Sequence, residues 1–517
     1  MANDDEINEI VIIDNGAHTM KVGLHTDTTP RIIPNCVTKV KNEKRRPFIG
    51  DQMDECKDYS GMYYILPFNR GYLLNWDVQR QIWDYVFRVV LKLQPDSKNR
   101  YSHLGILITE PVYNFPEIRQ TMIRILFEEY GFGKVLITSA PQLAALHYVH
   151  DDEIEIGRKP KSSLNPPSCC LVLDSGYSFS HVVPFVDGHK LLTHTKRVNV
   201  GGKALTNHLK EILSYRQINV LDETYVVNQM KEDCCFVSMD FWRDLESASK
   251  RDNPIARDYI LPDYIVYKRG FVYDPIKHSD INKSDYQLIR MNNERFQVPE
   301  ILFHPSDINM DQIGIVETII FSLNEFHPAF RLMSSKQATD NAANNNSTNE
   351  RENLKDIDSE EDEEQEEVEE DEEASIDDDQ DGETEQDNGD ENLKAKQPRL
   401  SQVQCTNGSI MDGLEMYDDE NIRAQLYGNI LLIGGNCRFV NFRDRVYNDL
   451  RCFVPDLIDI NVYQPSNPIT YAWQGGRILC QSELKNNNNN NNNRMNISDQ
   501  SLYHRFAVSR QQYQHKQ

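Results

Sequence analysis

The stretch Glu9–Leu24, EIVIIDNGAHTMKVGL, decides the fold of this chain. Its apolar run is typical of a strand, and the Asp14-Asn15-Gly16 that follows is typical of a tight turn. The stretch 169–181, CCLVLDSGYSFSH, repeats this plan and ends its strand at Asp174-Ser175-Gly176. Glycine in such a turn lets backbone N–H groups close on an anion, and the adjacent aspartate can hold a metal-bound water shell. One such turn is more often a plain hairpin, but two at the starts of similar halves predict a nucleotide held between two lobes.

The charge of the chain is concentrated in one segment. The 517 residues are 39% hydrophobic, which is enough to form two or more packed lobes. The formal net charge is −26, yet residues 356–391 contain 23 Asp or Glu and no Lys or Arg. All but about three of the net negative charges therefore lie in this segment, and the remaining chain is nearly neutral.

Two absences narrow the class of protein. The first residues lack the basic and apolar regions of a secretory signal, and no run approaches the ~18–20 apolar residues of a membrane span. The ten cysteines are scattered, and the adjacent pairs Cys169-Cys170 and Cys234-Cys235 lack metal-binding spacing. We therefore expect buried, reduced thiols in a cytosolic or nuclear protein rather than zinc sites or disulfides.

Alternating strand and helix patterns predict an α/β architecture. The predicted elements are helices over 79–93, 116–130 and 202–213 and strands over 105–108, 182–186 and 190–192. Asp187-Gly188 between the last two strands is a typical two-residue hairpin turn. A further group is expected to form the core of a late helix and a nearby strand: Val440, Phe442, Val446, Leu450 and Phe453.

Two stretches are too polar to offset the entropy of ordering them. Residues 334–418 are rich in Asn, Ser, Asp and Glu, and residues 486–499 begin with eight consecutive Asn. Folded character resumes after each stretch. We therefore expect two disordered insertions within a domain and not linkers between domains.

Most of the remaining chain resembles the actins and actin-related proteins. The matching segments, in the order of that family, are 9–24, 71–77, 109–111, 174–181, 295–318, 422–435 and 473–476. The resemblance implies an actin-like two-lobed fold, built from duplicated ribonuclease H-like domains, with four subdomains around a nucleotide cleft.

The resemblance also implies domain boundaries. The first lobe would span 7–150, with 35–72 as its small subdomain, and would be completed by 470–485 and 500–517; the second lobe would span 151–333 and 419–469, with about 200–290 as its small subdomain. The acidic insertion 334–418 and the Asn-rich insertion 486–499 would stand outside both lobes.

Three segments, 72–77, 196–211 and 223–238, resemble one class of actin-related proteins in particular. Members of that class are nuclear subunits of a remodelling complex that exchanges a variant histone into nucleosomes. The resemblance implies a non-catalytic structural subunit that supports transcription regulation, with the other subunits of a chromatin-remodelling complex as partners. It implies a nuclear location and leaves a cytoplasmic pool open.

Both glycine turns depart from the family pattern. The family's Asp-Asn-Gly-Ser-Gly is Asp-Asn-Gly-Ala-His here, so Ala17 lacks a hydroxyl for a terminal phosphate and His18 replaces a position without a side chain. In the second turn, Tyr177 and Ser178 replace an acidic metal-shell residue and a glycine. Phosphoryl transfer depends on positioning and on charge stabilisation at these places. We therefore assign no catalytic residue.

The family's water-positioning Gln is also displaced. Alignment on Leu146 places Pro141 at that position, with Gln142 next to it. A shift by one residue turns a helical side chain by about 100°. Gln142 is therefore a poor substitute, although Gln142 and Lys21 are the best support for the alternative function, an active ATPase of cytoskeletal or chaperone-like type.

Other parts of the family's pocket persist. The resemblance assigns cofactor binding to Asp14, Asn15, Gly16, Lys21, Asp174, Ser175, Gly176, Lys231, Glu232, Gly434 and Gly435. Lys21 would reach the phosphates, Asp14 and Asp174 would lie on the metal side, and Lys231 would lie near the ribose and base. Ile469 stands where the family has a lysine over the adenine. Two outcomes stay open: ATP bound with Mg and hardly hydrolysed, or an empty cleft.

Two charged segments have a plain and a functional interpretation. The basic stretch 39–47 is either a solvated loop or a functional segment, namely a nuclear-import signal or a nucleic-acid contact. It is shorter and more charged than the family's polymer-forming loop, so we expect no filaments. The acidic run 356–391 is either a solvated insert or a site that attracts basic histone tails. Neither segment indicates sequence-specific nucleic-acid binding.

Overall fold

The computed structural model describes residues 7, 9–40, 47–56, 62–96, 98, 100–151, 169–279, 281–325, 419–481 and 506–514. They belong to one compact unit of the chain, which comprises 1–330 and 419–517. The predicted insertions 334–418 and 486–499, the acidic run 356–391 and most of the basic stretch 39–47 lie outside the described residues.

Six strands form the first sheet, in the order β20-β10-β9-β1-β2-β3. They are β1 (Glu9–Asn15), β2 (Thr19–Leu24), β3 (Arg31–Pro34), β9 (Leu104–Glu110), β10 (Lys134–Ser139) and β20 (Val508–Ser509). The first two strands form an antiparallel hairpin, and β9 and β10 continue the sheet in parallel from β1. Side chains of β1 and β9 are buried on both faces, because helices cover both sides of this sheet.

The helices on the first sheet are α1 (Trp76–Tyr85), α2 (Pro116–Arg124), α3 (Ala140–His150), α13 (Tyr471–Gln481) and the short α15 (Arg510–Gln514). Apolar periodicity in the sequence predicts α1 and α2. The first of these begins at Trp76, earlier than predicted, because the side chain of Asn75 accepts a hydrogen bond from the Val78 N–H at 3.2 Å. Both α1 and α2 continue into wider π-helical turns, Val86–Val90 and Ile125–Glu129.

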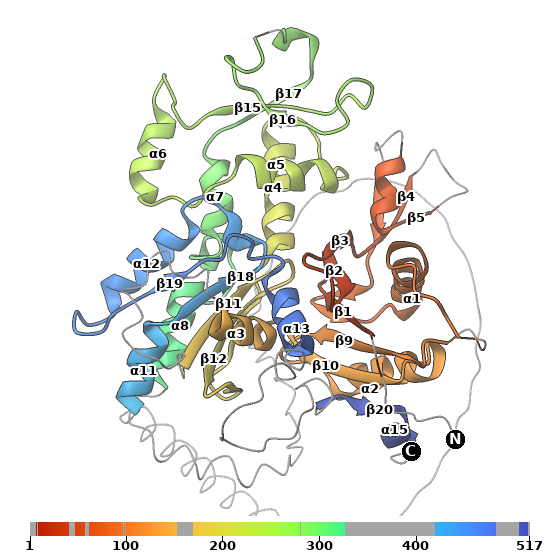
Figure 1. Ribbon diagram of the computed structural model, residues 1–517. Helices are drawn as coiled ribbons and strands as arrows, with labels where there is room; N and C mark the ends of the chain where they lie inside the picture. The colour runs from red at the N-terminus through yellow and green to blue at the C-terminus, as the bar shows by residue number, and fades with distance from the viewer. Residues whose placement is uncertain are drawn as a thin grey trace, which may run out of the picture. The chain divides into compact units, whose positions relative to one another are not determined.

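The second sheet repeats this plan, with the order β13-β12-β11-β18-β19 and β14 paired to β12 (Figure 1). Its strands are β11 (Cys169–Ser175), β12 (Ser180–Val186), β13 (His189–Lys190), β14 (Lys196–Val198), β18 (Ile430–Ile433) and β19 (Val462–Tyr463). Again a hairpin, β11–β12, is followed by parallel strands. Asp187 and Gly188 both have positive φ, at 48° and 76°, as the predicted two-residue turn requires. The strand after it covers only 189–190 and not 190–192.

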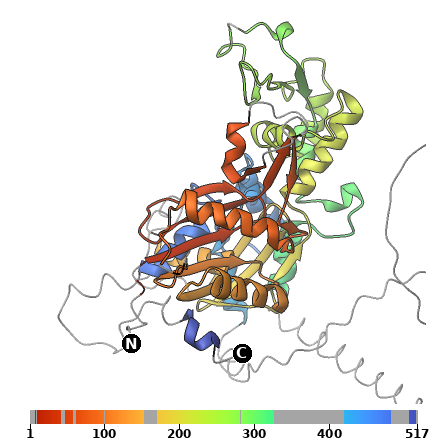
Figure 2. The same cartoon turned by 90° about the vertical axis from the view of Figure 1, so that its right-hand side faces the viewer.

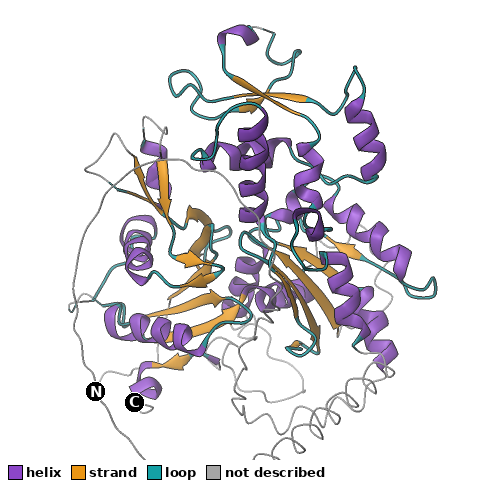
Figure 3. Ribbon diagram, turned by 180° about the vertical axis from the view of Figure 1, so that it is seen from behind, coloured by secondary structure: helices purple, strands orange, loops and turns teal. Residues whose placement is uncertain are grey.

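The largest core of the described chain lies against this second sheet. The helices that contribute to it include α4 (Gly202–Arg216), α5 (Thr224–Cys234), α7 (Glu294–Glu300), α8 (Ile315–Asn324), α11 (Asp419–Tyr427) and α12 (Phe442–Phe453). Figure 3 shows helices on both sides of the two sheets.

One prediction about this core is partly wrong. Phe442, Val446 and Leu450 are buried as expected, but Val440 and Phe453 are 64% and 65% exposed. Phe453 is the last residue of α12, and Val440 lies before that helix in an isolated bridge with Phe236. Both residues therefore fall outside the stretch of helix that packs on the sheet.

Two smaller sheets adjoin the large ones. The first, in the order β5-β4-β6, consists of β4 (Val37–Val40), β5 (Phe48–Ile49) and β6 (Met62–Ile65); the second, in the order β16-β15-β17, consists of β15 (Arg257–Ile260), β16 (Phe271–Val272) and β17 (Leu288–Met291). The remaining short elements are the hairpin of β7 (Phe68–Asn69) and β8 (Tyr72–Leu73), helix α6 (Phe241–Ser249), and 3₁₀ turns at Gly50–Glu55, Lys283–Asp285, Pro305–Ile308 and Asn436–Arg438. A small core on the first of these sheets is covered by Tyr225 and Tyr264 of the later part of the chain.

Helices α3 and α13 link the two large sheets. Leu143 and Trp473 pack on the first sheet, and Ala144 and Tyr148 pack on the second. The indole N–H of Trp473 donates to the carbonyl of Ile12 at 3.2 Å. The C-terminal segment 506–514 returns to the edge of the first sheet, where β20 pairs with β10 (Figure 2). The lobe boundaries themselves stay a prediction.

Two compositional expectations can be compared with this fold. Of the described cysteines, all are free, and only Cys452 is exposed. The predicted burial is therefore confirmed for the others in the described chain. No helix in the described part is long and apolar enough to cross a membrane.

Candidate functional site

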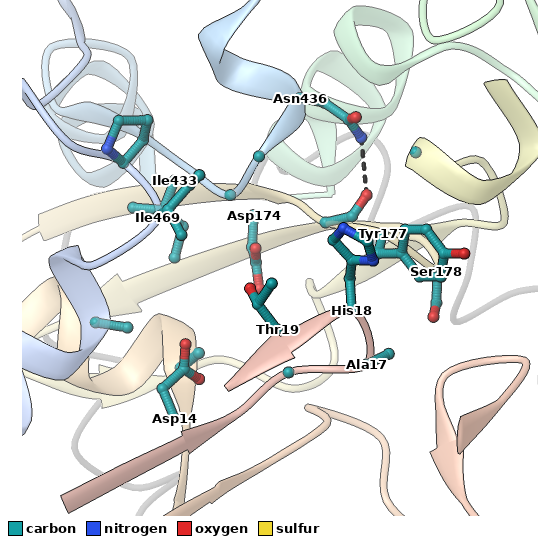
Figure 4. Close-up of a pocket in the computed structure, with 18 of the residues that line it drawn as sticks. Asp14, Ala17, His18, Thr19, Asp174, Tyr177, Ser178, Ile433, Asn436 and Ile469 are labelled. Carbon is teal, nitrogen blue, oxygen red and sulfur yellow. Dashed lines mark hydrogen bonds between the residues drawn. The ribbon is translucent and has the colours of Figure 1, made fainter. Parts of the chain in front are cut away.

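A cavity of about 540 Å³ lies between the two glycine turns (Figure 4). All of the candidate cofactor-binding residues except Ser175 line it. They come from the β1–β2 turn, the β11–β12 turn, helix α5 and the segment after β18. The folded chain thus brings together residues that are spread from Asp14 to Gly435.

The first turn is closed by glycine and held by a buried ion pair. A Cβ on Gly16 would lie 2.7 Å from the carbonyl oxygen of Thr19, so the turn has no room for a side chain there. Asp14 and Lys21 are paired across the β1–β2 hairpin, and their charged groups are 3.3 Å apart. Thr109 on β9 donates its hydroxyl to Asp14 at 2.8 Å, which fixes the carboxylate at the cavity wall.

The carboxylates of Asp14 and Asp174 line the cavity together with the ammonium of Lys21. Burial, and then the nearby Asp14 carboxylate, raise the pKa of Asp174 to about 7, while Lys21 opposes this shift. The side-chain amide of Asn15 is buried and has no hydrogen-bond partner among the described residues, and neither has Nε2 of His181. These groups can therefore accept or donate to water or to a hydrated cation.

The second turn is fastened to the segment that follows β18. The Ser175 hydroxyl lies 2.8 Å from that of Ser180, beneath the cavity wall. Asn436 donates its amide to Ser175 Oγ at 3.1 Å and to the Gly176 carbonyl at 2.8 Å. Gly434 has φ 97°, and a Cβ there would lie 2.2 Å from the Ser175 carbonyl oxygen. Sequence reasoning missed Asn436, although its place directly after two glycines was an available signal.

Lys231 is already engaged within the protein. Its ammonium donates to the Gly202 carbonyl at 3.1 Å and to Thr206 Oγ1 and Asn228 Oδ1, each at 2.9 Å. An ammonium has three N–H donors, so these contacts occupy all of them. Burial lowers the pKa of Lys231 to about 8. The structure thus shows Lys231 holding the start of α4, and its contact with a ribose stays a prediction.

The two aromatic departures from the family pattern meet in the cavity. The rings of His18 and Tyr177 are stacked, with centroids 4.7 Å apart and planes 19° from parallel (Figure 4). The imidazole of His18 is exposed to the cavity, but the protein groups packed around it, and then Lys231 and Lys21, lower its pKa below the ordinary value. The imidazole is therefore neutral near pH 7 and offers no positive charge to a phosphate.

Gln142 does not line the cavity, whereas Ala140 and Pro141 do. The Gln142 amide donates to the carbonyl of Gly188, in the β12–β13 turn, at 2.9 Å. The one-residue offset expected from the sequence thus directs the Gln142 amide to the Gly188 carbonyl and not into the cavity. Ile469 lines the cavity together with Pro468, and neither side chain can replace a lysine's charge.

These residues fit one part of a magnesium nucleotide and not another. Asp14, Asp174 and the unpartnered Asn15 amide suit a hydrated divalent cation, although no group of three or more metal-ligating side chains is found in the described chain. Gly434 and Gly435 leave room for a nucleoside. In contrast, the stacked rings occupy the gap between the turns, where N–H groups and a cation would hold terminal phosphates.

Comparison with known proteins agrees with the fold. The family model for actin matches residues 5–334 and 360–487. This chain therefore belongs to the actin family, and the predicted actin-like α/β fold is confirmed.

Several relatives narrow the class further. The chain is 37% identical to actin-related protein 6 of Drosophila melanogaster over 479 residues, which cover 92% of this chain and 94% of that protein. It is 30% identical over 501 residues to the protein of the same name in Oryza sativa subsp. japonica, covering 91% of this chain and 92% of the relative. It is 28% identical over 569 residues to that of Dictyostelium discoideum, covering 98% and 92%. These relatives are all named actin-related protein 6. This is the class of actin-related proteins that segments 72–77, 196–211 and 223–238 indicate.

Proposed function

We propose that this chain is a non-catalytic structural subunit of a nuclear chromatin-remodelling complex that exchanges a variant histone into nucleosomes. The proposal is supported by similarity along nine-tenths of the chain to relatives named actin-related protein 6. A second support is the resemblance of segments 72–77, 196–211 and 223–238 to a class of actin-related proteins with this role. The actin fold would serve as a rigid body that holds partner subunits.

One observation carries the non-catalytic part of the proposal, namely the stack of His18 on Tyr177 between the two turns. Enzymes that transfer phosphoryl groups act mainly by positioning the nucleotide and stabilising its charge. Here Ala17 has no hydroxyl, His18 is neutral and Gln142 is bonded to the Gly188 carbonyl. A slow residual ATPase stays compatible with this arrangement, because Lys21, Asp14 and Asp174 are retained.

The described surface offers contacts for partner subunits. Large apolar side chains are exposed on α6 and on the loops of the second small sheet, including Trp242 at 77% and Ile265 at 90% exposure. Exposed aromatic and aliphatic side chains are typical of protein contact surfaces. The acidic run 356–391, outside the described residues, is a second proposed contact, for basic histone tails.

Affinity purification tests the proposal. The full chain is tagged in its native cells, and the proteins recovered with it from nuclei are identified. We expect a remodelling ATPase and histones, and a variant lacking 356–391 should recover fewer histones but the same ATPase. Recovery of the tagged chain without any remodelling ATPase would contradict the proposed function.

The alternative, an active ATPase of the same fold, makes a different prediction. A single-turnover assay on the isolated protein measures hydrolysis of bound ATP directly. We expect hydrolysis far slower than that of a conventional actin measured alongside. A comparable rate that is lost in Asp174→Ala would favour the ATPase instead.

A further inference from the structure

The His18–Tyr177 stack joins the tips of two hairpins that belong to different sheets. His18 lies between β1 and β2, and Tyr177 lies between β11 and β12. Both rings can be reached from the cavity, so neither is simply buried in the core of its own sheet. The contact is therefore made across the cavity between the two parts of the fold (Figure 4).

A second contact fastens the β11–β12 turn, which carries Tyr177, to the first part of the chain. The ring of Phe179 packs directly on Gly71, where a Cβ would lie 1.8 Å from the ring. The guanidinium of Arg197 lies 4.3 Å from the Phe179 ring centroid and donates to the hydroxyl of Tyr72 at 2.7 Å. The β11–β12 turn is thus held to the β7–β8 hairpin as well as to the first glycine turn.

The chemistry of the stack is unfavourable for an anion. A phosphate between the turns would need backbone N–H groups and positive charge directed at it. The N–H of Gly176 is instead bonded to the carbonyl of Phe179 at 3.0 Å. The neutral imidazole supplies no charge, and it lies against the phenol ring of Tyr177. A terminal phosphate would have to displace this stack, whereas a nucleoside near Gly434 would not.

We propose that His18 and Tyr177 form a clasp that joins the two glycine turns in place of terminal phosphates, so that the cavity selects nucleosides and nucleoside diphosphates and gains nothing from a third phosphate. This inference deepens the proposed function, on which it rests, because a cleft that the protein itself holds closed needs no ATP to keep its shape. Attractive contacts between aromatic rings are strong enough to matter at such an interface.

Ligand binding to the full-length protein tests the clasp. Isothermal titration with MgATP and MgADP compares wild type, His18→Ala/Tyr177→Ala, the ring-preserving Tyr177→Phe, and Tyr215→Ala, which removes a tyrosine that is 93% exposed. In wild type we expect MgADP to bind, and MgATP to bind no more than about threefold tighter than MgADP. The double variant should gain at least about tenfold in affinity for MgATP, while Tyr177→Phe and Tyr215→Ala should behave as wild type.

Two results would overturn the clasp. One is a wild-type preference for MgATP over MgADP of more than about threefold, and this result does not depend on any variant folding. The other is a double variant that unfolds cooperatively but gains no affinity for MgATP.

Thermal unfolding gives a further measure. After nucleotide and divalent cations are removed, the wild-type midpoint with 1 mM MgATP should lie within about 2 °C of the midpoint with 1 mM MgADP. A rise with MgATP that exceeds the rise with MgADP by more than this would count against the clasp. These outcomes are independent of the purification experiment, since a chain without remodelling partners could still have the clasp, and a chain with those partners could lack it.

Discussion

The carbonyl oxygen of Leu143 on α3 lies 1.9 Å from the position that a Cβ on Gly475 of α13 would occupy. No side chain fits at this crossing. Because α3 and α13 pack on both large sheets, the close approach sets the spacing between the two halves of the fold.

We expect Gly475→Ala to destabilise the protein by about 1–3 kcal/mol, as overpacking usually does. The gain in helix propensity, about 1 kcal/mol, works in the opposite direction but is smaller, because a backbone carbonyl cannot move aside easily. Gly435→Ala is the control, since no atom lies within 4 Å of its Cβ position. Denaturant unfolding measures both, and equal stabilities would show that the crossing is not tight.

A buried ion pair joins α7 to α12. The guanidinium of Arg445 bonds both oxygens of Glu300, at 2.7 and 3.1 Å. We expect Arg445→Met to cost about 3–5 kcal/mol in unfolding free energy, because it leaves the buried Glu300 carboxylate with only the half-exposed His304 as a partner. The double variant Arg445→Met/Glu300→Met should recover much of this loss. Arg443→Met, which breaks an exposed pair with Asp444, should change stability by less than about 1 kcal/mol.

Stability should depend on pH through His304, which lies 2.8 Å from Glu300. The hydrogen bond to Glu300 raises the pKa of His304, so its contribution is complete below the unfolded pKa of about 6.5 and is lost as pH rises through the folded value. Burial alone would raise the pKa of Glu300, but hydrogen bonds from His304 and Arg445 lower it overall. Its contribution is therefore present above about pH 4.5 and is lost as pH falls through the folded value.

The two titrations together predict that this pair stabilises the fold most between about pH 4.5 and 6.5. In His304→Gln, the stability curve should be flatter as pH rises above about 6.5, with a change below about 1 kcal/mol because the imidazole is half exposed. Chemical unfolding at several pH values measures this. An unchanged slope would mean that the ion pair is absent in solution.

Gln142 offers a direct test of the alternative function. Because its amide is bonded to the Gly188 carbonyl and does not line the cavity, Gln142→Ala should leave any residual single-turnover hydrolysis within about twofold of wild type. Asp174→Ala serves as the comparison, since that carboxylate does line the cavity. A loss of about tenfold or more in Gln142→Ala would show that this amide reaches a bound nucleotide.

Much of this protein could be predicted locally. Apolar runs followed by Asp-x-Gly located both hairpins, and Asp187-Gly188 located a turn whose positive φ values only certain residues adopt readily. Helix periodicity located α1 and α2 together with the turns that follow them, but not the π-helical form of those turns. It also misassigned Val440 and Phe453, because periodicity cannot show where a helix leaves the core that covers it.

By itself, the sequence determined the α/β class, the family and the departures from the family's turn pattern at Ala17, His18, Tyr177 and Ser178. These properties depend on residue type and on short-range order. Only the tertiary structure decided that His18 and Tyr177 stack on each other, and that the three donors of Lys231 are bonded within the protein. Contacts between such distant residues follow from how the two sheets and the helices between them pack, and no local pattern encodes that packing.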